Sequence, residues 1–192
     1  MSEQQSDINQ HIAQHIRELR LNKGYSLDQL ATRSGVSRSS ISLIERAATS
    51  PTAVILEKLA AALDVSLASL FVFETANNQP EPVLRYEQQS LWRDPASGYL
   101  RRNLSAPQAA SPMQLVEITF PAQTQVSYDF VPREVKVYQQ IWILNGEMQI
   151  HLGEQCYILQ QGDSLSIQLN QPIVFENSTA HQARYLLAVC EV

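Results

Sequence analysis

The sequence predicts an α+β protein made of two unlike parts, an all-α bundle followed by an all-β sandwich or barrel. Up to about Phe73, apolar residues recur at the spacing of a helix face, whereas from Val83 onward they alternate with polar residues. Between these regimes lies ETANNQPEP, residues 74–82, which is polar and contains two prolines. We therefore expect a helical domain over 1–73, a linker over 74–82 and a β-domain over 83–192.

Composition excludes several classes of protein. The chain has 192 residues and 44% hydrophobic content, which is ordinary for a globular protein. Its apolar runs fall short of the roughly 20 residues that a membrane span needs, and its N-terminal MSEQQSDINQ lacks the pattern of a secretory leader. Two separated cysteines, Cys156 and Cys190, do not predict a disulfide framework. We expect a cytoplasmic protein with no membrane association.

The net charge of −5 is unevenly distributed along the chain. Residues 8–50 hold six basic side chains against three acidic ones, whereas residues 74–192 hold seven basic against twelve acidic. The acidity therefore belongs to the C-terminal part. A locally basic N-terminal part is compatible with a polyanionic partner.

The first three helices are predicted from apolar spacing and capping residues. The apolar stripe of the first helix comprises Ile12, Ile16 and Leu19. This helix should end near Lys23-Gly24, where glycine suits a C-cap. Ser26 followed by Gln29 has the pattern of a capping box for a second helix, 27–33. Gly35 then turns the chain, and Ser37 can cap a third helix that runs to about Arg46.

Two further helices complete a predicted five-helix bundle. The sequence Ser50-Pro51-Thr52 breaks and restarts the chain. A fourth helix over 53–63 has an apolar face of Ile55, Leu56, Leu59, Ala60 and Leu63. A short fifth helix is expected near 66–71.

The second and third helices, joined by a tight glycine-containing turn, form a helix-turn-helix. The residues that fit its buried positions are Leu30, Ala31, Gly35, Val36, Ile41 and Ile44. Those left facing outward are Arg38, Ser39, Ser40, Ser42 and Leu43. Small polar side chains allow such a helix to approach base edges in the major groove, and arginine can pair with guanine or a phosphate.

Residues 8–71 resemble the five-helix DNA-binding domain of the XRE (phage-repressor/Cro-like) family, most specifically in LATRSGVSRSSISLIER and SPTAVILEKLAAALDV. The resemblance implies that Arg38, Ser39, Ser40 and Leu43 face bases, with Ser37, Ser42, Arg46 and Thr49 nearer the phosphates. It also implies a charge pair between Arg20 and Glu45. Leu43 and Leu27 stand where the family usually has polar residues, so the operator sequence of this protein cannot be taken over from its relatives. The alternative is a helical dimerisation module that shares this fold.

The β-domain is predicted from strand-length runs separated by turn signals. The runs are MQLVEITF, QVSYDFV, VKVYQQIWIL, EMQIHL, QCYIL, DSLSIQL, PIVFE and RYLLAVCEV. The clearest turns are Asn145-Gly146, Leu152-Gly153-Glu154 and Gln161-Gly162-Asp163. The run LWRDPASGYLRRNLS is expected to supply the first strands.

The stretch from Val137 to Asn177 resembles the conserved-barrel (cupin) domain found after this helix-turn-helix in many bacterial regulators. The resemblance rests on Asn145-Gly146-Glu147, on Gly162-Asp163 and on the ending Pro172 to Asn177. Metal-binding cupins carry three histidines and a glutamate, and those four positions fall here on Arg133, Val135, Gln139 and Ile173. None is a good ligand for a first-row metal. We therefore expect no metal, no cofactor and no enzymatic activity.

Other metal candidates are weak. His11 and His15 stand four residues apart without a matching carboxylate or cysteine. His151, His181, Cys156 and Cys190 are scattered without a ligand motif, and whether either histidine pair takes up adventitious metal stays open.

A barrel of this size can hold one small ligand. Alternation from Gln139 puts Ile141 and Ile143 on the inward face, and Phe175 on the face of Ile173. The predicted ligand-binding residues are Arg101, Tyr128, Arg133, Gln139, Ile141, Ile173, Phe175 and Arg184, with Tyr138 and Trp142 as wall or rim contributors. Aromatic rings beside an unpaired arginine suit a small carboxylate such as an amino acid.

Together these features predict a transcriptional regulator that binds a palindromic double-stranded operator as a homodimer held mainly by its barrel. A small-molecule effector would change operator affinity through the linker. Two alternatives stay open at this point: a cupin enzyme with an attached helix-turn-helix, and a barrel that serves only for dimerisation.

Overall fold

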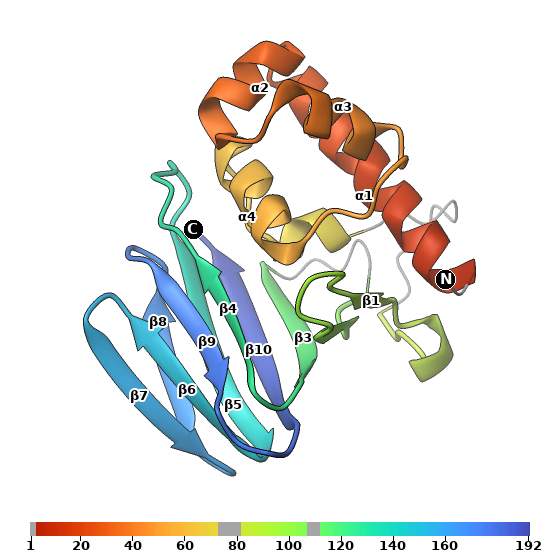
Figure 1. Cartoon of the computed structure of the whole chain (residues 1–192). Coiled ribbons are helices and arrows are strands. Elements are labelled where there is room, and N and C mark those ends of the chain that lie inside the picture. Colours follow the sequence, from red (N-terminus) through yellow and green to blue (C-terminus); the bar gives the residue numbers. More distant parts are fainter. Residues whose placement is uncertain (1–2, 73–81, 107–111) are drawn as a thin grey trace.

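In the computed structural model, a bundle of helices sits on one end of a two-sheet β-structure (Figure 1). The structure describes residues 3–72, 82–106 and 112–192. The predicted linker, 74–82, lies outside the described residues except for its last position. Among the described residues, no helix is both long and apolar enough to cross a membrane.

Four α-helices build the bundle: α1 (Glu3–Asn22), α2 (Leu27–Ser34), α3 (Arg38–Glu45) and α4 (Ala53–Ala62). The predicted caps are confirmed. The Ser26–Gln29 capping box opens α2, Gly35 ends it with a left-handed φ of 67°, and the Ser37 hydroxyl accepts from Ser40 N–H to cap α3. The buried core of the bundle includes Ile12, Ile16, Leu30, Ile41 and Leu56.

The prediction of a fifth α-helix is wrong in kind. The segment is a single 3₁₀ turn, η1 (Ala68–Phe71). Both ends of the segment are held by the β-structure: Asn103 Nδ2 donates to the Phe71 carbonyl at 2.7 Å, and Ser66 N–H donates to Glu191 Oε1 at 3.1 Å. Within the segment, Ser69, Leu70 and Val72 N–H donate to the carbonyls three residues earlier, which is the 3₁₀ pattern and is typical of short helical pieces. A second 3₁₀ turn, η2 (Tyr86–Gln88), precedes the strands.

The β-structure consists of two antiparallel sheets facing each other, as the alternation predicts. The six-stranded sheet has the order β1-β2-β3-β10-β5-β8, and the four-stranded sheet β4-β9-β6-β7. The strands are β1 (Leu91–Arg93), β2 (Leu100–Asn103), β3 (Met113–Phe120), β4 (Thr124–Tyr128), β5 (Val137–Asn145), β6 (Glu147–Leu152), β7 (Gln155–Gln160), β8 (Ser164–Gln168), β9 (Ile173–Asn177) and β10 (Ala183–Glu191).

One turn between strands requires glycine. Gly146 joins β5 to β6 with φ 83°, a conformation that favours glycine. A Cβ built there would stand 3.0 Å from Ala183 Cα, so the close approach of β10 excludes a side chain as well. The predicted Asn145-Gly146 turn is thereby explained by two independent constraints.

The bundle and the β-structure share one continuous apolar cluster rather than two separate cores. A chain of aromatic rings crosses the junction, with centroid distances of 5.4 Å from Phe71 to Trp92, 6.0 Å from Trp92 to Tyr99 and 5.8 Å from Tyr99 to Phe120. Asp94 Oδ1 also accepts from the Ala53 N–H at 2.9 Å, at the start of α4. The predicted boundaries of the two domains stay a prediction, but across this junction the domains are packed tightly.

Candidate nucleic-acid interface and interior cavity

The predicted DNA-contacting side chains lie on α3, on its two cap residues and, for Thr49, in the turn that follows. Ile41 and Ile44 are buried against the bundle. The exposed residues are Ser37, Arg38, Ser39, Leu43, Arg46 and Thr49, and the half-buried ones are Ser40 and Ser42. Leu43 is 41% exposed. The helix therefore offers a small, mostly uncharged surface with an arginine near each end.

Hydrogen bonds within this surface are local. Ser37 Oγ lies 3.0 Å from Ser39 Oγ and 2.8 Å from Ser40 Oγ. Arg38 Nε is 3.3 Å from Asp28 Oδ1, and both of these side chains are more than half exposed. Because an exposed ion pair contributes little stability, a phosphate or a guanine can replace Asp28 as the partner of Arg38 at small cost.

An ion pair predicted from the family resemblance fixes α3 to α1. Arg20 donates from Nε to Glu45 Oε1 at 2.6 Å and from Nη2 to Oε2 at 2.8 Å. Arg20 Nη1 also donates to the Tyr25 carbonyl at 2.8 Å. The side chains of Arg20 and Glu45 are only 10% and 7% exposed, and the hydrogen bonds to Glu45 raise the pKa of Arg20. The pair therefore orients α3 from behind and leaves its outer surface free.

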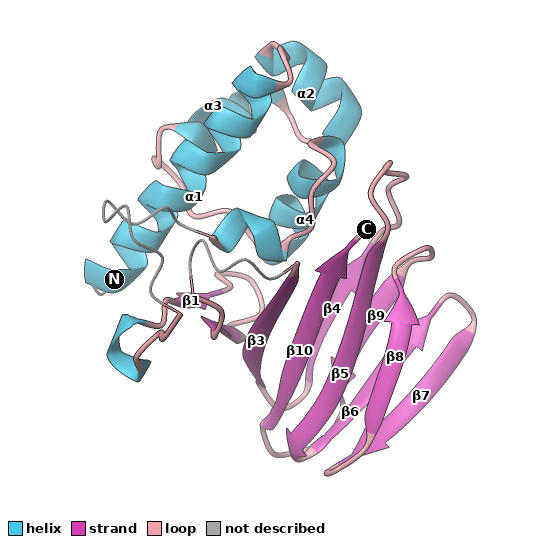
Figure 2. Cartoon of the chain, turned by 180° about the vertical axis from the view of Figure 1, so that it is seen from behind, coloured by secondary structure: helices cyan, strands magenta, loops and turns pink. Residues whose placement is uncertain are grey.

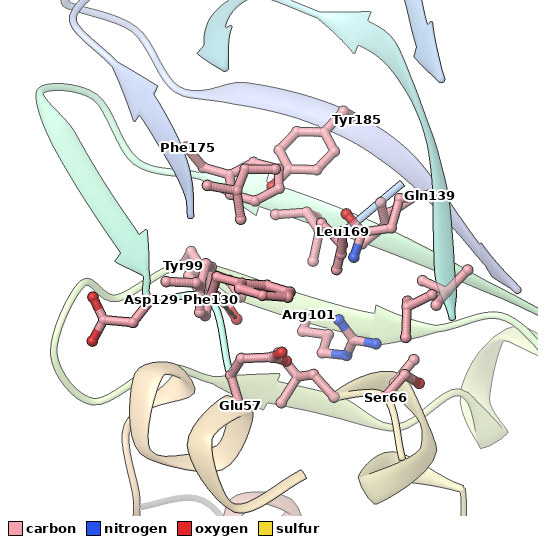
Figure 3. A pocket seen from close by; sticks show the side chains of 18 of the residues that line it. Glu57, Ser66, Tyr99, Arg101, Asp129, Phe130, Gln139, Leu169, Phe175 and Tyr185 are labelled. Atoms are coloured by element: carbon pink, nitrogen blue, oxygen red, sulfur yellow. Dashed lines mark hydrogen bonds between the residues drawn. The ribbon is translucent and has the colours of Figure 1, made fainter. Parts of the chain in front are cut away.

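A cavity lies where α4 and η1 meet the interior of the β-structure (Figure 3). The space open to the centres of water-sized spheres is about 60 Å³, enough for about four waters or a small ligand. Most of its wall is apolar or aromatic and comes from the strands, including Phe120, Ile173, Phe175 and Leu187. The bundle contributes the remaining side, with Glu57 and the segment from Ser66 to Ala68.

Among the described side chains, Arg101 has the most buried polar atoms without a hydrogen-bond partner. Its side chain points into the cavity from β2 (Figure 3), and it is 3% exposed. Its Nε and Nη2 are buried without a hydrogen-bond partner, although the guanidinium lies over the Phe71 ring at 4.8 Å. Burial lowers the pKa of Arg101, but a guanidinium keeps its charge at neutral pH. A buried cation with free donors is thus presented to whatever fills the cavity.

The second arginine of the cavity is paired. Arg133 Nη2 donates to Glu57 Oε1, and Nη1 donates to the Val65 carbonyl at 3.0 Å. Burial raises the pKa of Glu57, an effect that Arg133 opposes. Burial also raises the pKa of Tyr99 to about 12, so this phenol stays neutral and does not balance Arg101. With Arg101, Arg133 and Glu57 charged, the buried groups of the cavity carry a net charge of +1.

Six of the eight residues predicted to bind a ligand line this cavity: Arg101, Tyr128, Arg133, Gln139, Ile173 and Phe175. Two do not. Ile141 is inward and fully buried, but it lies further along β5 than Gln139 and packs in the core. Arg184 is exposed, because Tyr185 next to it takes the inward position. Tyr138 and Trp142 are also on the outer face, 41% and 48% exposed.

Sequence reasoning missed the cavity residues that come from the bundle, Glu57 and Ser66 to Ala68. One signal was present for the first of these. Glu57 is the only acidic residue in the α4 sequence AVILEKLAAA, and it is 8% exposed. A carboxylate on an apolar face of a helix predicts a buried partner, but nothing in the sequence says that the partner is Arg133.

The cavity does not suit the metal that many cupins carry. The four positions aligned with cupin ligands hold Arg133, Val135, Gln139 and Ile173, and Glu57, the buried carboxylate of the cavity, is engaged by Arg133. Two guanidiniums would repel a divalent cation. Within residues 3–72, 82–106 and 112–192, no group of three His, Cys, Asp or Glu side chains could hold a metal ion.

His151 and Cys156 are less scattered than their sequence positions predict. They face each other in the β6–β7 register, with Cys156 Sγ 3.9 Å from His151 Nε2. His151 Nε2 also lies 3.3 Å from Glu176 Oε2. The distances are those of a loose polar contact on an outer sheet face and not of a metal centre.

Comparisons with known proteins agree with this geometry. The helix-turn-helix family HTH_3 matches residues 16–70. The chain is 41% identical over 93 residues to the HTH-type transcriptional regulator SinR of Bacillus licheniformis, an overlap of 47% of this chain and 83% of that protein. It is 49% identical over 65 residues to SlrR of Bacillus subtilis (strain 168), which spans 33% of this chain and 43% of that regulator.

A solved structure covers both parts of the chain. The HTH_3 family transcriptional regulator from Vibrio cholerae superposes with a TM-score of 0.75 at 29% identity, over 97% of this chain and 98% of that one. Such a match includes the helical bundle together with the β-structure. The exposed face of α3, the sequence relatives and the full-length structural match lead to one assignment: this chain belongs to the XRE family of helix-turn-helix transcriptional regulators, with a C-terminal domain of two facing β-sheets.

Proposed function

We propose that this regulator binds a palindromic operator as a homodimer, and that a small carboxylate bound in the interdomain cavity changes its affinity for that operator. The observation that carries the proposal is the concentration of unpaired buried polar atoms in one cavity. Among the described residues, six such atoms occur, and four belong to Arg101, Arg133 and Gln139, which all line it. Buried polar groups normally have partners, so this cavity is built to receive one.

The charge and shape of the cavity define the ligand. The net charge of +1 on the buried groups favours an anion, since the other acid of the lining, Asp129, is exposed and paired with Lys58 at 3.1 Å. The free Nε and Nη2 of Arg101 match the two oxygens of a carboxylate. Gln139 Oε1 is an unpaired acceptor and needs a donor such as an amino or hydroxyl group. The apolar wall requires an apolar remainder. An amino acid or a hydroxy acid with a small apolar side chain meets all three requirements.

The contact between the domains offers the ligand a route to the DNA-binding surface. Arg133 links the barrel to Glu57 and to the Val65 carbonyl of the bundle, while Glu191 binds the Ser66 N–H. A ligand in the cavity touches both sides of this contact. It therefore changes operator affinity if it favours one docking of the bundle over another, and operator DNA changes ligand affinity by the same factor.

A binding screen tests the effector. Native mass spectrometry of the protein with free amino acids, hydroxy acids and their amides, each in roughly 10- to 100-fold excess, detects ligands with a Kd on the order of micromolar. It should show one ligand per chain for the carboxylates. The amides should not bind, since they lack the negative charge that Arg101 requires. Binding of neutral amides as tightly as of carboxylates would refute the role of Arg101, and no binding by any compound would refute the effector.

Arg38→Ala tests the DNA interface. If Arg38 reads a base or a phosphate from the start of α3, its loss should weaken operator binding by about 1–3 kcal/mol, measured by fluorescence anisotropy at fixed salt. Arg85→Ala is the matched control, since Arg85 is an exposed arginine outside the bundle. Equal affinities of the two variants would remove Arg38 from the interface.

A further inference from the structure

The outer face of the six-stranded sheet is exposed and apolar. Met113, Tyr138 and Trp142 are 52%, 41% and 48% exposed, and all three point away from the interior. Around them lie half-buried Leu115, Leu186 and Ala188. Figure 2 shows β3, β10, β5 and β8 from this side, with the helical bundle at one end of the strands and not over them. We call these six residues the outer apolar face.

None of these six side chains is charged, although Glu117 stands opposite Leu186 on the same side of the sheet. The polar residues beside them are Gln140, Ser164, Ser166 and Gln168, and two shallow grooves run between these and the apolar residues. Glu117 and Arg184 border it on β3 and β10. In a chain of net charge −5, an uncharged surface of this extent is the place where a second acidic chain can approach without repulsion. Exposed Trp, Tyr and Met are also the residues enriched in protein interfaces.

We propose that this face is the homodimer interface, occupied by the same face of a second copy of the chain. The proposal rests on the dimer proposed above and names the surface that forms it. Three strands of eight or nine residues and the five-residue β8, about 4.8 Å apart, present a flat area on the order of 450 Å² before side-chain relief is counted. That is more than half of the roughly 800 Å² that each partner of a standard interface buries.

The geometry of the molecule suits this pairing. Two sheets pack face to face when their strands are nearly aligned. Because the bundle lies at one end of the strands (Figure 2), a two-fold axis running roughly along the strands puts both bundles at the same end. Both α3 helices can then approach one DNA duplex, as a pair of half-sites one helical turn apart requires.

Trp142→Glu tests the interface, with Ile158→Glu as its matched control. Ile158 is 60% exposed on β7, so it places the same charge on an exposed strand residue of the other sheet. In sedimentation equilibrium, Trp142→Glu should raise the dimer dissociation constant about 100-fold or more, because the two-fold axis buries the charge twice. Ile158→Glu should leave it unchanged.

The outcomes separate this inference from the proposed function. If Trp142→Glu dimerises like the wild type, the outer apolar face is not the interface, although the dimer stands. If the wild type is monomeric at all concentrations, the proposed dimer itself fails, and this inference with it.

Tryptophan fluorescence gives a test that needs no substitution and so covers a variant that does not fold. The chain has two tryptophans, and Trp92 is fully buried. On dilution through the dimer dissociation constant, the emission of Trp142 should shift to longer wavelength as water reaches it. An unchanged spectrum while the sedimenting mass halves would overturn the proposal.

Discussion

Replacing Arg20 with alanine should lower the free energy of unfolding by about 3–5 kcal/mol, the range measured when one partner of a buried ion pair is removed. The variant leaves the Glu45 carboxylate, 7% exposed, without the guanidinium that donates to both of its oxygens. It also removes the donor to the Tyr25 carbonyl. A loss of this size is a large share of the 5–15 kcal/mol that typical domains possess. Urea unfolding followed by circular dichroism measures it.

The control is Lys23→Ala on the same side of the bundle. Lys23 Nζ lies 2.7 Å from Asp64 Oδ2, but the two side chains are 33% and 24% exposed, so water screens the pair and the cost should be below about 1 kcal/mol. Operator binding by Arg20→Ala should fall together with its folded fraction, because Arg20 orients α3 and does not lie on its outer surface. A cost for Arg20→Ala no greater than that for Lys23→Ala would show that the Arg20–Glu45 pair contributes little to stability.

The elements of this fold could be predicted because their signals are local. The run MQLVEITF coincides with β3 (Met113–Phe120), and EMQIHL with β6 (Glu147–Leu152). In both, one face is buried and the register fixes which residues point inward. The capping box at Ser26 and the turn at Gly35 lie within a few residues of the helices that they end or begin. Such short-range patterns need no knowledge of the rest of the chain.

The cavity could be predicted only in part, because alternation gives the face of a residue and not its place along the strand. Ile141 and Gln139 share a face of β5, yet only Gln139 reaches the cavity, since the bundle meets one end of the strands. The contribution of Glu57 depends on Arg133, 76 residues away. Neither local sequence predicts the contact between Glu57 and Arg133, because that contact forms only when the two domains pack against each other.

Replacing Arg101 with methionine should stabilise the ligand-free protein, by about 1–4 kcal/mol, and abolish its response to the effector. Arg101 is buried with two donors unpaired, so its charge opposes folding more than its contact with Phe71 favours it. Methionine keeps much of the volume of arginine and needs no hydrogen-bond partner. Thermal and urea unfolding measure the first effect, and operator binding with and without the carboxylate measures the second.

The same substitution at Arg133 should have the opposite sign. Arg133→Met leaves the Glu57 carboxylate 8% exposed and without its partner, and it removes the donor to the Val65 carbonyl, so the protein should lose about 3–5 kcal/mol. The same substitution would thus change the free energy of unfolding in opposite directions at the two arginines of the cavity. Arg133 is paired with Glu57, whereas Arg101 has two donors left for a ligand. If Arg101→Met destabilises the protein as Arg133→Met does, Arg101 is a structural residue, and the cavity loses the group that would recognise a carboxylate.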